Sequence, residues 1–370
     1  MELIEQLLTD AAAARQQGAA HRARELYGRA LQIDPHQPLA LRRLAWLEDD
    51  LGDLPAAIAL LQKLIALQPT DARAWQDLGL CLRRSGQLQE ASERFRRATE
   101  LEPTYAPAFC NLGLVLEDLG DQPGAVRALQ RAAELQPDSG FIAFHLATVS
   151  GSTDVPVCPR EYLVQLFDGY ADRFDQHLFE TLSYRGPALL ADIVAGHGPP
   201  RPWDIIDIGC GTGMTAVPFR AHARSILGVD LSAGMLRQAA RRITADGRPF
   251  YDALLHAEIV TTLQQHSASF DLVLSADVFI YIGDLRPVLA ASHAALRPGG
   301  LIAFTTETTQ GPKDFCLLPT RRYAQSPAYI ARLADELRFK IVDHRQAQLR
   351  LGEDGKPIVG DVYLLQRSEP

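Results

Sequence analysis

The sequence predicts a two-domain protein in which an all-α array of helix pairs precedes an α/β domain with a mostly parallel sheet. Three observations support this fold class. The chain has 370 residues, more than one typical domain. A 34-residue period runs through its first 150 residues, and strand and helix signals alternate in its second half. We expect a repeat domain over 1–150, a linker over 151–160 and the α/β domain over 161–370.

Each repeated column has a physical reason. The recurring glycine suits the end of the first helix of a pair, where a left-handed backbone is needed. The recurring proline stops the second helix. These columns are the glycines at positions 18, 52, 86 and 120 and the prolines at positions 35, 69, 103 and 137. Small residues recur with the same period and allow the two helices of a pair to approach closely.

This pattern resembles the tetratricopeptide repeat (TPR), and 74–103 matches that family's pattern best. We place four repeats at 4–37, 38–71, 72–105 and 106–139, with a capping helix over 141–151. The resemblance implies a concave surface that binds a protein or peptide partner. The alternatives are a structural scaffold or an arm that forms a homodimer.

Composition and charge limit the partners. Hydrophobic residues make up 47% and charged residues 22% of the chain, which is typical of a globular protein. The net charge of −8 argues against a nucleic-acid or membrane partner. The five cysteines form no CxxC motif, so we expect neither a metal site nor a disulfide framework. With no signal-peptide pattern at the N-terminus and no long apolar stretch, we expect a cytoplasmic protein.

The clearest site signal is WDIIDIGCGTG at 203–213. An apolar run ends in Asp207, and three alternate glycines follow, which let a backbone turn pass close to a ligand. A dinucleotide-binding fingerprint would place a glycine at Met214, so that motif is not matched. The D-x-G-x-G-x-G form resembles motif I of class I S-adenosylmethionine-dependent methyltransferases. Taken alone, the glycines could also form an ordinary tight turn.

The remaining segments follow in the order of that family. A second apolar strand ends in Asp230, and a third strand signal is 253–259. The next segments are a strand with its following loop over 270–285, and a helix, a Pro-Gly-Gly turn and a strand over 295–307. The antiparallel pair 339–344 and 361–367 comes last. The resemblance implies a Rossmann-like fold with an antiparallel C-terminal strand and S-adenosylmethionine as the cofactor. Together with the repeats, nearly the whole chain resembles bacterial TPR proteins fused to a class I methyltransferase domain.

The resemblance also implies a set of cofactor-binding residues. Asp207 would hold a loop amide or reach the cofactor's amino group, and Asp230 would accept both ribose hydroxyls. Glu258 would receive the adenine amino group, although Ala257 could occupy that motif position. Cys210 is interpreted as a small filler in the glycine loop. The full predicted set is Asp207, Gly209, Cys210, Gly211, Gly213, Asp230, Leu231, Met235, Ala257, Glu258 and Ala276.

The segment 161–182 resembles the helix that folds over the cofactor in small-molecule and ubiquinone-type methyltransferases. Tyr170, Phe174 and His177 have spacings of four and three, which would place them on one helix face. The alternative is a helix that docks the repeats against the second domain. His177 is a candidate general base or a structural histidine. Asp277, after the fourth strand, could orient a substrate donor or cap a helix.

Further substrate contacts are predicted in two loops. Tyr281 lies in the loop after the fourth strand, and Arg321, Arg322 and Tyr323 lie in the long connection 308–330. Paired arginines could hold a carboxylate or phosphate, or simply form a solvated basic face.

The sequence therefore predicts a methyltransferase that modifies an O or N acceptor on a peptide, protein or carrier-bound substrate recruited by the repeats. Two alternatives remain open. One is a small-molecule O- or N-methyltransferase whose repeats mediate dimerisation, and the other is a non-catalytic adaptor that keeps the fold.

Overall fold

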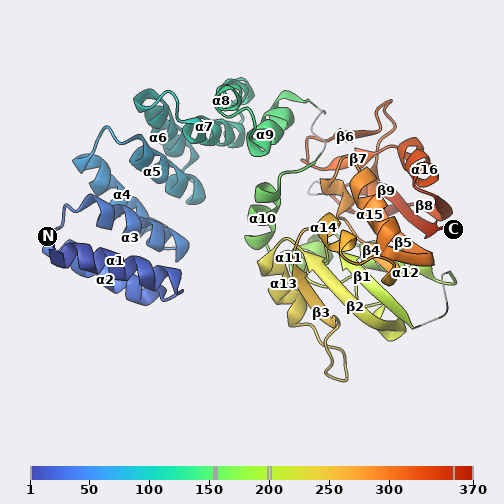
Figure 1. Ribbon diagram of the computed structural model, residues 1–370. Coiled ribbons are helices and arrows are strands. Elements are labelled where there is room, and N and C mark those ends of the chain that lie inside the picture. Colours follow the sequence, from blue (N-terminus) through green and yellow to red (C-terminus); the bar gives the residue numbers. More distant parts are fainter. Residues whose placement is uncertain (1, 153–156, 198–199, 201, 353–354, 369–370) are drawn as a thin grey trace. The chain divides into compact units, whose positions relative to one another are not determined.

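A computed structural model describes residues 2–152, 157–197, 200, 202–352 and 355–368. The chain separates into two compact units, Met1–Ser150 and Gly151–Pro370 (Figure 1). Each unit has its own hydrophobic core and is described separately below.

The first unit is an array of helices in which each helix packs on the next (Figure 1). Its helices are α1 (Glu2–Gln16), α2 (Ala20–Ile33), α3 (Pro38–Asp50), α4 (Leu54–Leu67), α5 (Ala72–Arg84), α6 (Leu88–Leu101), α7 (Ala106–Asp118), α8 (Gln122–Leu135) and α9 (Gly140–Ser150). The repeating glycines end the first helix of each pair, and all four have positive φ, between 75° and 84°. The repeat period therefore reflects a left-handed turn at the same place in every pair.

Close helix packing explains the small residues inside the pairs. A Cβ on Gly79 would lie 2.6 Å from the ring of Phe95, and a Cβ on Gly113 would lie 2.5 Å from the side chain of Leu129. Both large partners are fully buried. A glycine in the first helix thus makes the space that an aromatic or leucine side chain of the second helix fills.

A ladder of ion pairs connects the first helices of consecutive repeats. Each pair joins residues 35 positions apart, near the carboxyl ends of these helices. The pairs are Arg15–Asp50, Arg84–Asp49 and Arg83–Asp118. Exposed pairs of this kind contribute roughly 0–1 kcal/mol each. They add to the packing that sets the register of neighbouring repeats.

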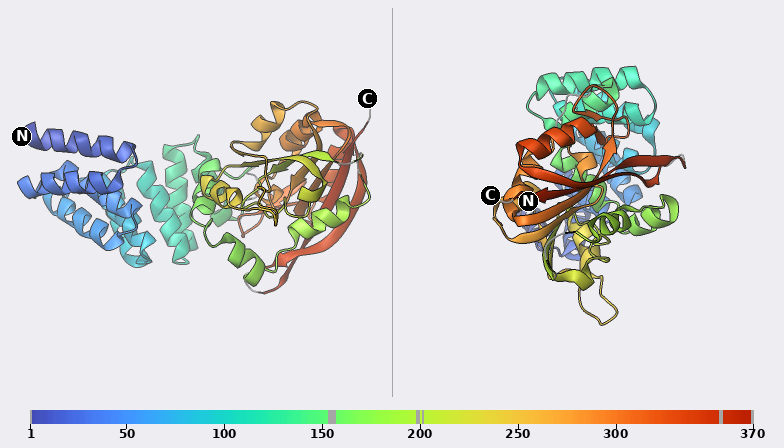
Figure 2. Two further views of the ribbon diagram at one scale, coloured as in Figure 1. Left: turned by 90° about the horizontal axis from the view of Figure 1, so that it is seen from below. Right: turned by 90° about the vertical axis from the view of Figure 1, so that its right-hand side faces the viewer.

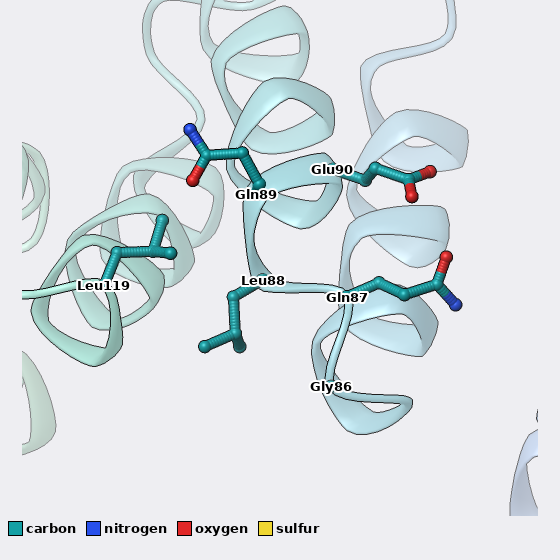
Figure 3. A pocket seen from close by; sticks show the side chains of 6 residues that line it. All are labelled: Gly86, Gln87, Leu88, Gln89, Glu90 and Leu119. Atoms are coloured by element: carbon teal, nitrogen blue, oxygen red, sulfur yellow. The ribbon is translucent and has the colours of Figure 1, made fainter.

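A surface hollow lies where α5 turns into α6. It is lined by Gly86, Gln87, Leu88, Gln89, Glu90 and Leu119 (Figure 3). Glu90 is the only charged residue among them, so the lining offers no cluster that would hold a charged ligand.

The second unit is built on a nine-stranded sheet in the order β3-β2-β1-β4-β5-β7-β6, with β9 antiparallel to β5 and β8 antiparallel to β9. Strands β3, β2, β1, β4 and β5 run parallel to one another. The strands are β1 (Trp203–Ile208), β2 (Ala223–Asp230), β3 (Ala253–His256), β4 (Phe270–Ser275), β5 (Leu296–Thr308), β6 (Phe315–Leu317), β7 (Tyr323–Gln325), β8 (Phe339–Leu351) and β9 (Pro357–Arg367).

Helices cover both faces of this sheet (Figure 2). One core forms between the sheet and α14 (Ile259–Gln264), α15 (Arg286–Ala295) and α16 (Pro327–Glu336). A second core lies on the other face, beneath α12 (Gly186–Val194) and α13 (Ala233–Ala240). The predicted fold class, a helical repeat array followed by a mostly parallel α/β sheet with an antiparallel C-terminal strand, is confirmed. Within the described residues, no helix combines the length and the apolar character that a membrane span requires.

Several element boundaries differ from the sequence-based expectation. The segment 161–182 is an interrupted helix, made of α10 (Arg160–Asp168), α11 (Phe174–Gln176) and a π-helical turn over His177–Thr181. Gly169 follows α10, and Tyr170 lies in the turn that separates the two parts. β3 ends at His256, two residues before Glu258, and β5 already includes the Pro-Gly-Gly segment after Leu296. The expected linker 151–160 falls partly on 153–156, outside the described residues.

Candidate functional site

The glycine loop follows β1 and lies at the carboxyl ends of the parallel strands. Gly209, Gly211 and Gly213 have φ values of 70°, 53° and 90°, the left-handed region that favours glycine. A Cβ on Gly209 would collide with Val278, and one on Gly213 would lie 2.9 Å from Tyr251. Gly211 has open space where its Cβ would be. Two glycines are therefore required by packing, and the third leaves room beside the loop.

Asp230, the last residue of β2, connects the glycine loop to the loop that follows it. Its Oδ2 accepts a hydrogen bond from the backbone N–H of Gly211 at 2.8 Å, and its Oδ1 accepts one from the N–H of Ser232 at 2.8 Å. Burial raises the pKa of Asp230, and these N–H donors act in the opposite direction. A carboxylate offers about four acceptor sites, so each oxygen can still accept a hydroxyl from a ligand.

Asp207 lies at the end of β1 and is completely buried. Its Oδ2 accepts a hydrogen bond from the hydroxyl of Tyr251 at 2.6 Å. Within the described part of the chain, its Oδ1 has no hydrogen-bond donor. Burial raises the pKa of Asp207 to about 7. A buried acceptor without a donor is costly, so this oxygen suits a hydrogen-bond donor supplied by a ligand.

The other predicted cofactor residues lie on the same edge of the sheet, after β2, β3 and β4. Met235 is buried in α13, whereas Leu231, Ala257 and Ala276 are partly buried. Glu258 is the N-cap of α14, and its two carboxylate oxygens accept hydrogen bonds from the N–H groups of Val260 and Thr261. Glu258 thus caps α14 with the same side chain that we expected at the adenine amino group, and that second role stays a prediction.

Cys210 is buried in the glycine loop. Burial raises the pKa of its thiol well above the ordinary value, which disfavours the reactive thiolate. This environment favours the interpretation of Cys210 as a packing residue.

The interrupted helix 160–182 lies against both loops of the site, and we call it the lid segment. The carboxylate of Asp168 accepts hydrogen bonds from the hydroxyl of Ser232 at 2.6 Å and from the N–H of Gly234 at 2.9 Å. Asp175 accepts one from the hydroxyl of Thr212 at 2.5 Å and forms an ion pair with Arg242. Two lid carboxylates thus hold the glycine loop and the start of α13.

The predicted aromatic group of the lid segment is brought together even though the helix is interrupted. The Tyr170 and Phe174 rings meet edge to face at 5.3 Å, and the Tyr170 hydroxyl forms a hydrogen bond with Nδ1 of His177. Phe167 packs edge-on against Tyr281, with 5.4 Å between the ring centroids. The lid segment therefore also contacts the loop after β4.

The arginines of the long connection have different environments. The Arg322 side chain forms a hydrogen bond with the Tyr281 hydroxyl. The Arg321 guanidinium lies 5.9 Å from the centroid of the Tyr162 ring, in a cation–π arrangement. Tyr323 is fully buried in β7, a position typical of a core residue. Of these three residues, Arg322 lies beside the predicted substrate residue Tyr281.

Asp277 has a φ of 57°, an uncommon conformation for a residue other than glycine. Its carboxylate forms an ion pair with Arg350 of β8, and Arg350 also pairs with Glu307 of β5. Sequence reasoning missed Arg350 and Glu307. A signal was present, because Arg350 stands between two leucines in a strand and Glu307 ends an apolar strand. Charged residues in such positions are rarely buried unless they are paired.

Comparisons with known proteins agree with this architecture. A family model described as a methyltransferase domain matches residues 206–302. A tetratricopeptide repeat model matches residues 8–72, and the model of the middle TPR-like domain of cilia and flagella-associated protein 70 matches residues 41–149. The chain thus matches tetratricopeptide repeat models in its first part and a methyltransferase-domain model in its second part.

Curated relatives match the methyltransferase part. A malonyl-[acyl-carrier protein] O-methyltransferase of Pseudescherichia vulneris is 33% identical over 140 residues, 38% of this chain and 51% of that protein. The tRNA 5-carboxymethoxyuridine methyltransferase of Escherichia coli (strain K12) is 26% identical over 149 residues, covering 39% and 57%. Human methyltransferase-like protein 27 is 34% identical over 154 residues, covering 39% and 58%. The chain thus spans about half the length of these relatives.

Two solved structures are similar to part of the chain. The match to a crystal structure of MamA covers 38% of this chain and 85% of the MamA chain, with 26% identity and a TM-score of 0.37. The match to the Burkholderia thailandensis 1,6-didemethyltoxoflavin-N1-methyltransferase covers 58% of this chain and 95% of that chain, with 19% identity and a TM-score of 0.44.

Proposed function

We propose that the chain is an S-adenosylmethionine-dependent methyltransferase that acts on an O or N acceptor of a peptide, protein or carrier-bound substrate recruited by its repeats. The Asp230 carboxylate carries this proposal, because it bridges Gly211 and Ser232 and keeps acceptor sites for two hydroxyls. The match of the methyltransferase family model to residues 206–302 supports it.

The residues at the glycine loop fit this cofactor. Asp230 would accept hydrogen bonds from the ribose hydroxyls of the cofactor. Oδ1 of Asp207, which has no donor among the described residues, would accept one from the amino group of the cofactor's methionine part. The open space at Gly211 leaves room beside the loop backbone. Met235, Leu231, Ala257 and Ala276 would supply apolar contacts to the adenine. When bound, the cofactor supplies an electrophilic methyl group.

In the repeat unit, an exposed aromatic residue supports substrate recruitment. Trp46 in α3 is 41% exposed, and its side chain forms a hydrogen bond with Asp77 of the next repeat. Large aromatic side chains of this kind are common anchors at protein interfaces. We propose that Trp46 contacts the recruited peptide, protein or carrier.

Calorimetry with S-adenosylmethionine tests cofactor binding. Because Asp230→Ala removes charge-assisted hydrogen bonds to two hydroxyls, it should weaken the affinity of the full chain at least tenfold. Asp246→Ala is the matched control, since Asp246 is a surface residue that pairs with Arg248. If the wild-type chain does not bind, or if Asp230→Ala binds as tightly as wild type, the proposal is wrong.

Recruitment needs a separate experiment. Methyl transfer from radiolabelled cofactor would be measured with a peptide library and with malonyl-acyl carrier protein. Trp46→Ala should raise KM for a macromolecular acceptor several-fold and leave cofactor affinity unchanged. An unchanged KM, together with a dimer detected by sedimentation, would instead favour a small-molecule enzyme with dimerising repeats.

A further inference from the structure

We propose that Arg350, Asp277 and Glu307 form the subsite that binds the methyl acceptor in the methyltransferase domain. This subsite takes a neutral O–H or N–H group. Arg350 is the residue that positions Asp277. The inference rests on the proposed function and adds to it the chemical class of the methyl acceptor. It is carried by a largely buried charge cluster beside the glycine loop.

Arg350 holds two carboxylates from different strands. Its guanidinium contacts Oδ2 of Asp277, beyond β4, and Oε1 of Glu307 at the end of β5. Only 1% of the Arg350 surface is exposed. Arg350 and Glu307 are therefore buried together, whereas the Asp277 side chain is 18% exposed, and Arg322 adds a second positive charge near Glu307. Burying charged groups of this kind costs free energy, so a contribution to stability alone does not explain the cluster.

The cluster adjoins the cofactor side of the site. Val278 packs against Gly209, so the residue next to Asp277 contacts the glycine loop. The Tyr184 hydroxyl interacts electrostatically with both Asp277 and Asp207. The chain around Tyr184 is also tied to β8, because the N–H of Arg185 donates to Leu349 and the N–H of Leu351 donates to Leu182. Residues 182–185, at and just after the end of the lid segment, are thus hydrogen-bonded to the backbone on either side of Arg350.

One carboxylate oxygen of Asp277 is bound by Arg350, and the other is available to a ligand. Oδ2 is taken by Arg350, whereas Oδ1 is buried and has no hydrogen-bond donor among the residues that the structure describes. The left-handed backbone at Asp277 adds strain of the order of 1 kcal/mol, a feature that clusters at functional sites. A buried acceptor without a donor would be satisfied by an O–H or N–H of a ligand.

This chemistry defines the acceptor. A lone pair of the acceptor oxygen or nitrogen forms the new bond to the methyl carbon. The carbon–sulfur bond breaks, and its electron pair stays on sulfur. The O–H or N–H proton passes to Oδ1 of Asp277. A carboxylate acceptor has no such proton and would meet the Asp277 charge, so the subsite disfavours it.

The first test measures binding without catalysis. The full chain is saturated with S-adenosylhomocysteine, and the binding of phenol, anisole and benzoate is followed by ligand-observed NMR. The three probes share a ring, but only phenol donates a hydrogen bond, and benzoate is an anion. We expect phenol to bind about tenfold more tightly than anisole or benzoate, because its donor meets a charged acceptor.

Three variants assign the effect to the cluster. Asp277→Ala should abolish the preference for phenol. Arg350→Gln should reduce it several-fold, and Arg350→Lys should restore part of it, because a positive charge remains. Arg297→Lys is the matched control, since Arg297 also holds two carboxylates, those of Asp204 and Asp271. The affinity for S-adenosylhomocysteine should stay unchanged in all variants, which shows that each is folded.

The outcomes separate this inference from the proposed function. If the chain does not bind S-adenosylhomocysteine, the proposed function itself is wrong. If it binds, and phenol shows no saturable binding or no preference over anisole and benzoate, the acceptor subsite is wrong. A preference that survives in Asp277→Ala also overturns it. An unchanged preference in Arg350→Gln overturns the positioning role of Arg350.

Discussion

Asp207 combines complete burial with a carboxylate oxygen that receives no donor from the described part of the chain. The Tyr251 hydroxyl stabilises its charge only in part, and burial raises its pKa to about 7. In an unfolded chain the pKa of an aspartate is about 3.9. The folded state therefore disfavours the charged form of Asp207, and a ligand with a positive amino group would favour it.

This difference predicts a pH dependence of stability. Because the folded pKa is raised, the contribution of Asp207 is fully present below about pH 4 and is lost as the pH rises through about 7. Asp207→Asn cannot ionise. Thermal unfolding without cofactor should show wild type losing stability relative to Asp207→Asn between about pH 4 and pH 8. A constant difference in Tm over this range would contradict the prediction.

The glycines of the loop predict two separable effects. Gly209→Ala should destabilise the protein, because a Cβ there collides with Val278 at a φ of 70°. Gly211→Ala meets open space, so its cost should be limited to the left-handed backbone, about 1 kcal/mol. It should nevertheless weaken cofactor binding by filling the space beside the loop. Thermal unfolding and calorimetry measured on both variants distinguish the two effects, and similar losses of stability would count against this assignment.

Among the elements, the lid segment contacts both loops of the proposed cofactor site. It holds the glycine loop through Asp175 and the start of α13 through Asp168. Its helix is interrupted after Gly169, which divides it into two short parts. These contacts are local and polar, so the segment can release the loops without unfolding the sheet.

We expect Asp175→Asn to speed the release of S-adenosylhomocysteine about tenfold. The change removes the charge that binds both Thr212 and Arg242, so the lid segment would hold the glycine loop more weakly. Asp172→Asn is the control, because Asp172 accepts its exposed hydrogen bond from the side chain of Gln238 and not from the glycine loop. Stopped-flow measurement of dissociation compares the two variants, and equal rates would show that the lid does not retain the ligand.

Sequence reasoning predicts those elements that depend on local or periodic signals. The repeat helices follow from glycines and prolines with a 34-residue period, and the parallel strands follow from apolar runs. The interruption of 161–182 and the capping by Glu258 depend on which contacts the folded chain makes available. Arg350 meets Asp277 across 73 positions, a pairing that spacing alone does not reveal. Sequence alone therefore indicates the glycine loop and the aspartates at the strand ends, Asp207 and Asp230, as parts of the candidate site.

The whole molecule consists of two units with separate cores. A ligand that binds only the native α/β unit stabilises that unit and not the other. We expect scanning calorimetry to resolve two transitions, with S-adenosylhomocysteine at about 100 times its Kd stabilising one of them by about 2.7 kcal/mol. Asp230→Ala should lose this effect. A single transition that shifts as a whole would show that the units unfold together.

The ion-pair ladder of the repeat unit has a consequence for the order of the repeats. Its members alternate in sign, from Arg15–Asp50 to Asp49–Arg84 and then Arg83–Asp118. Removing residues 38–71 would keep the helical period but bring Arg15 opposite Arg84, and removing 72–105 would bring Asp49 opposite Asp118. Like charges in such positions repel. The repeats share one architecture, yet the signs of their charges favour the present neighbours over the arrangement that would follow the deletion of a repeat.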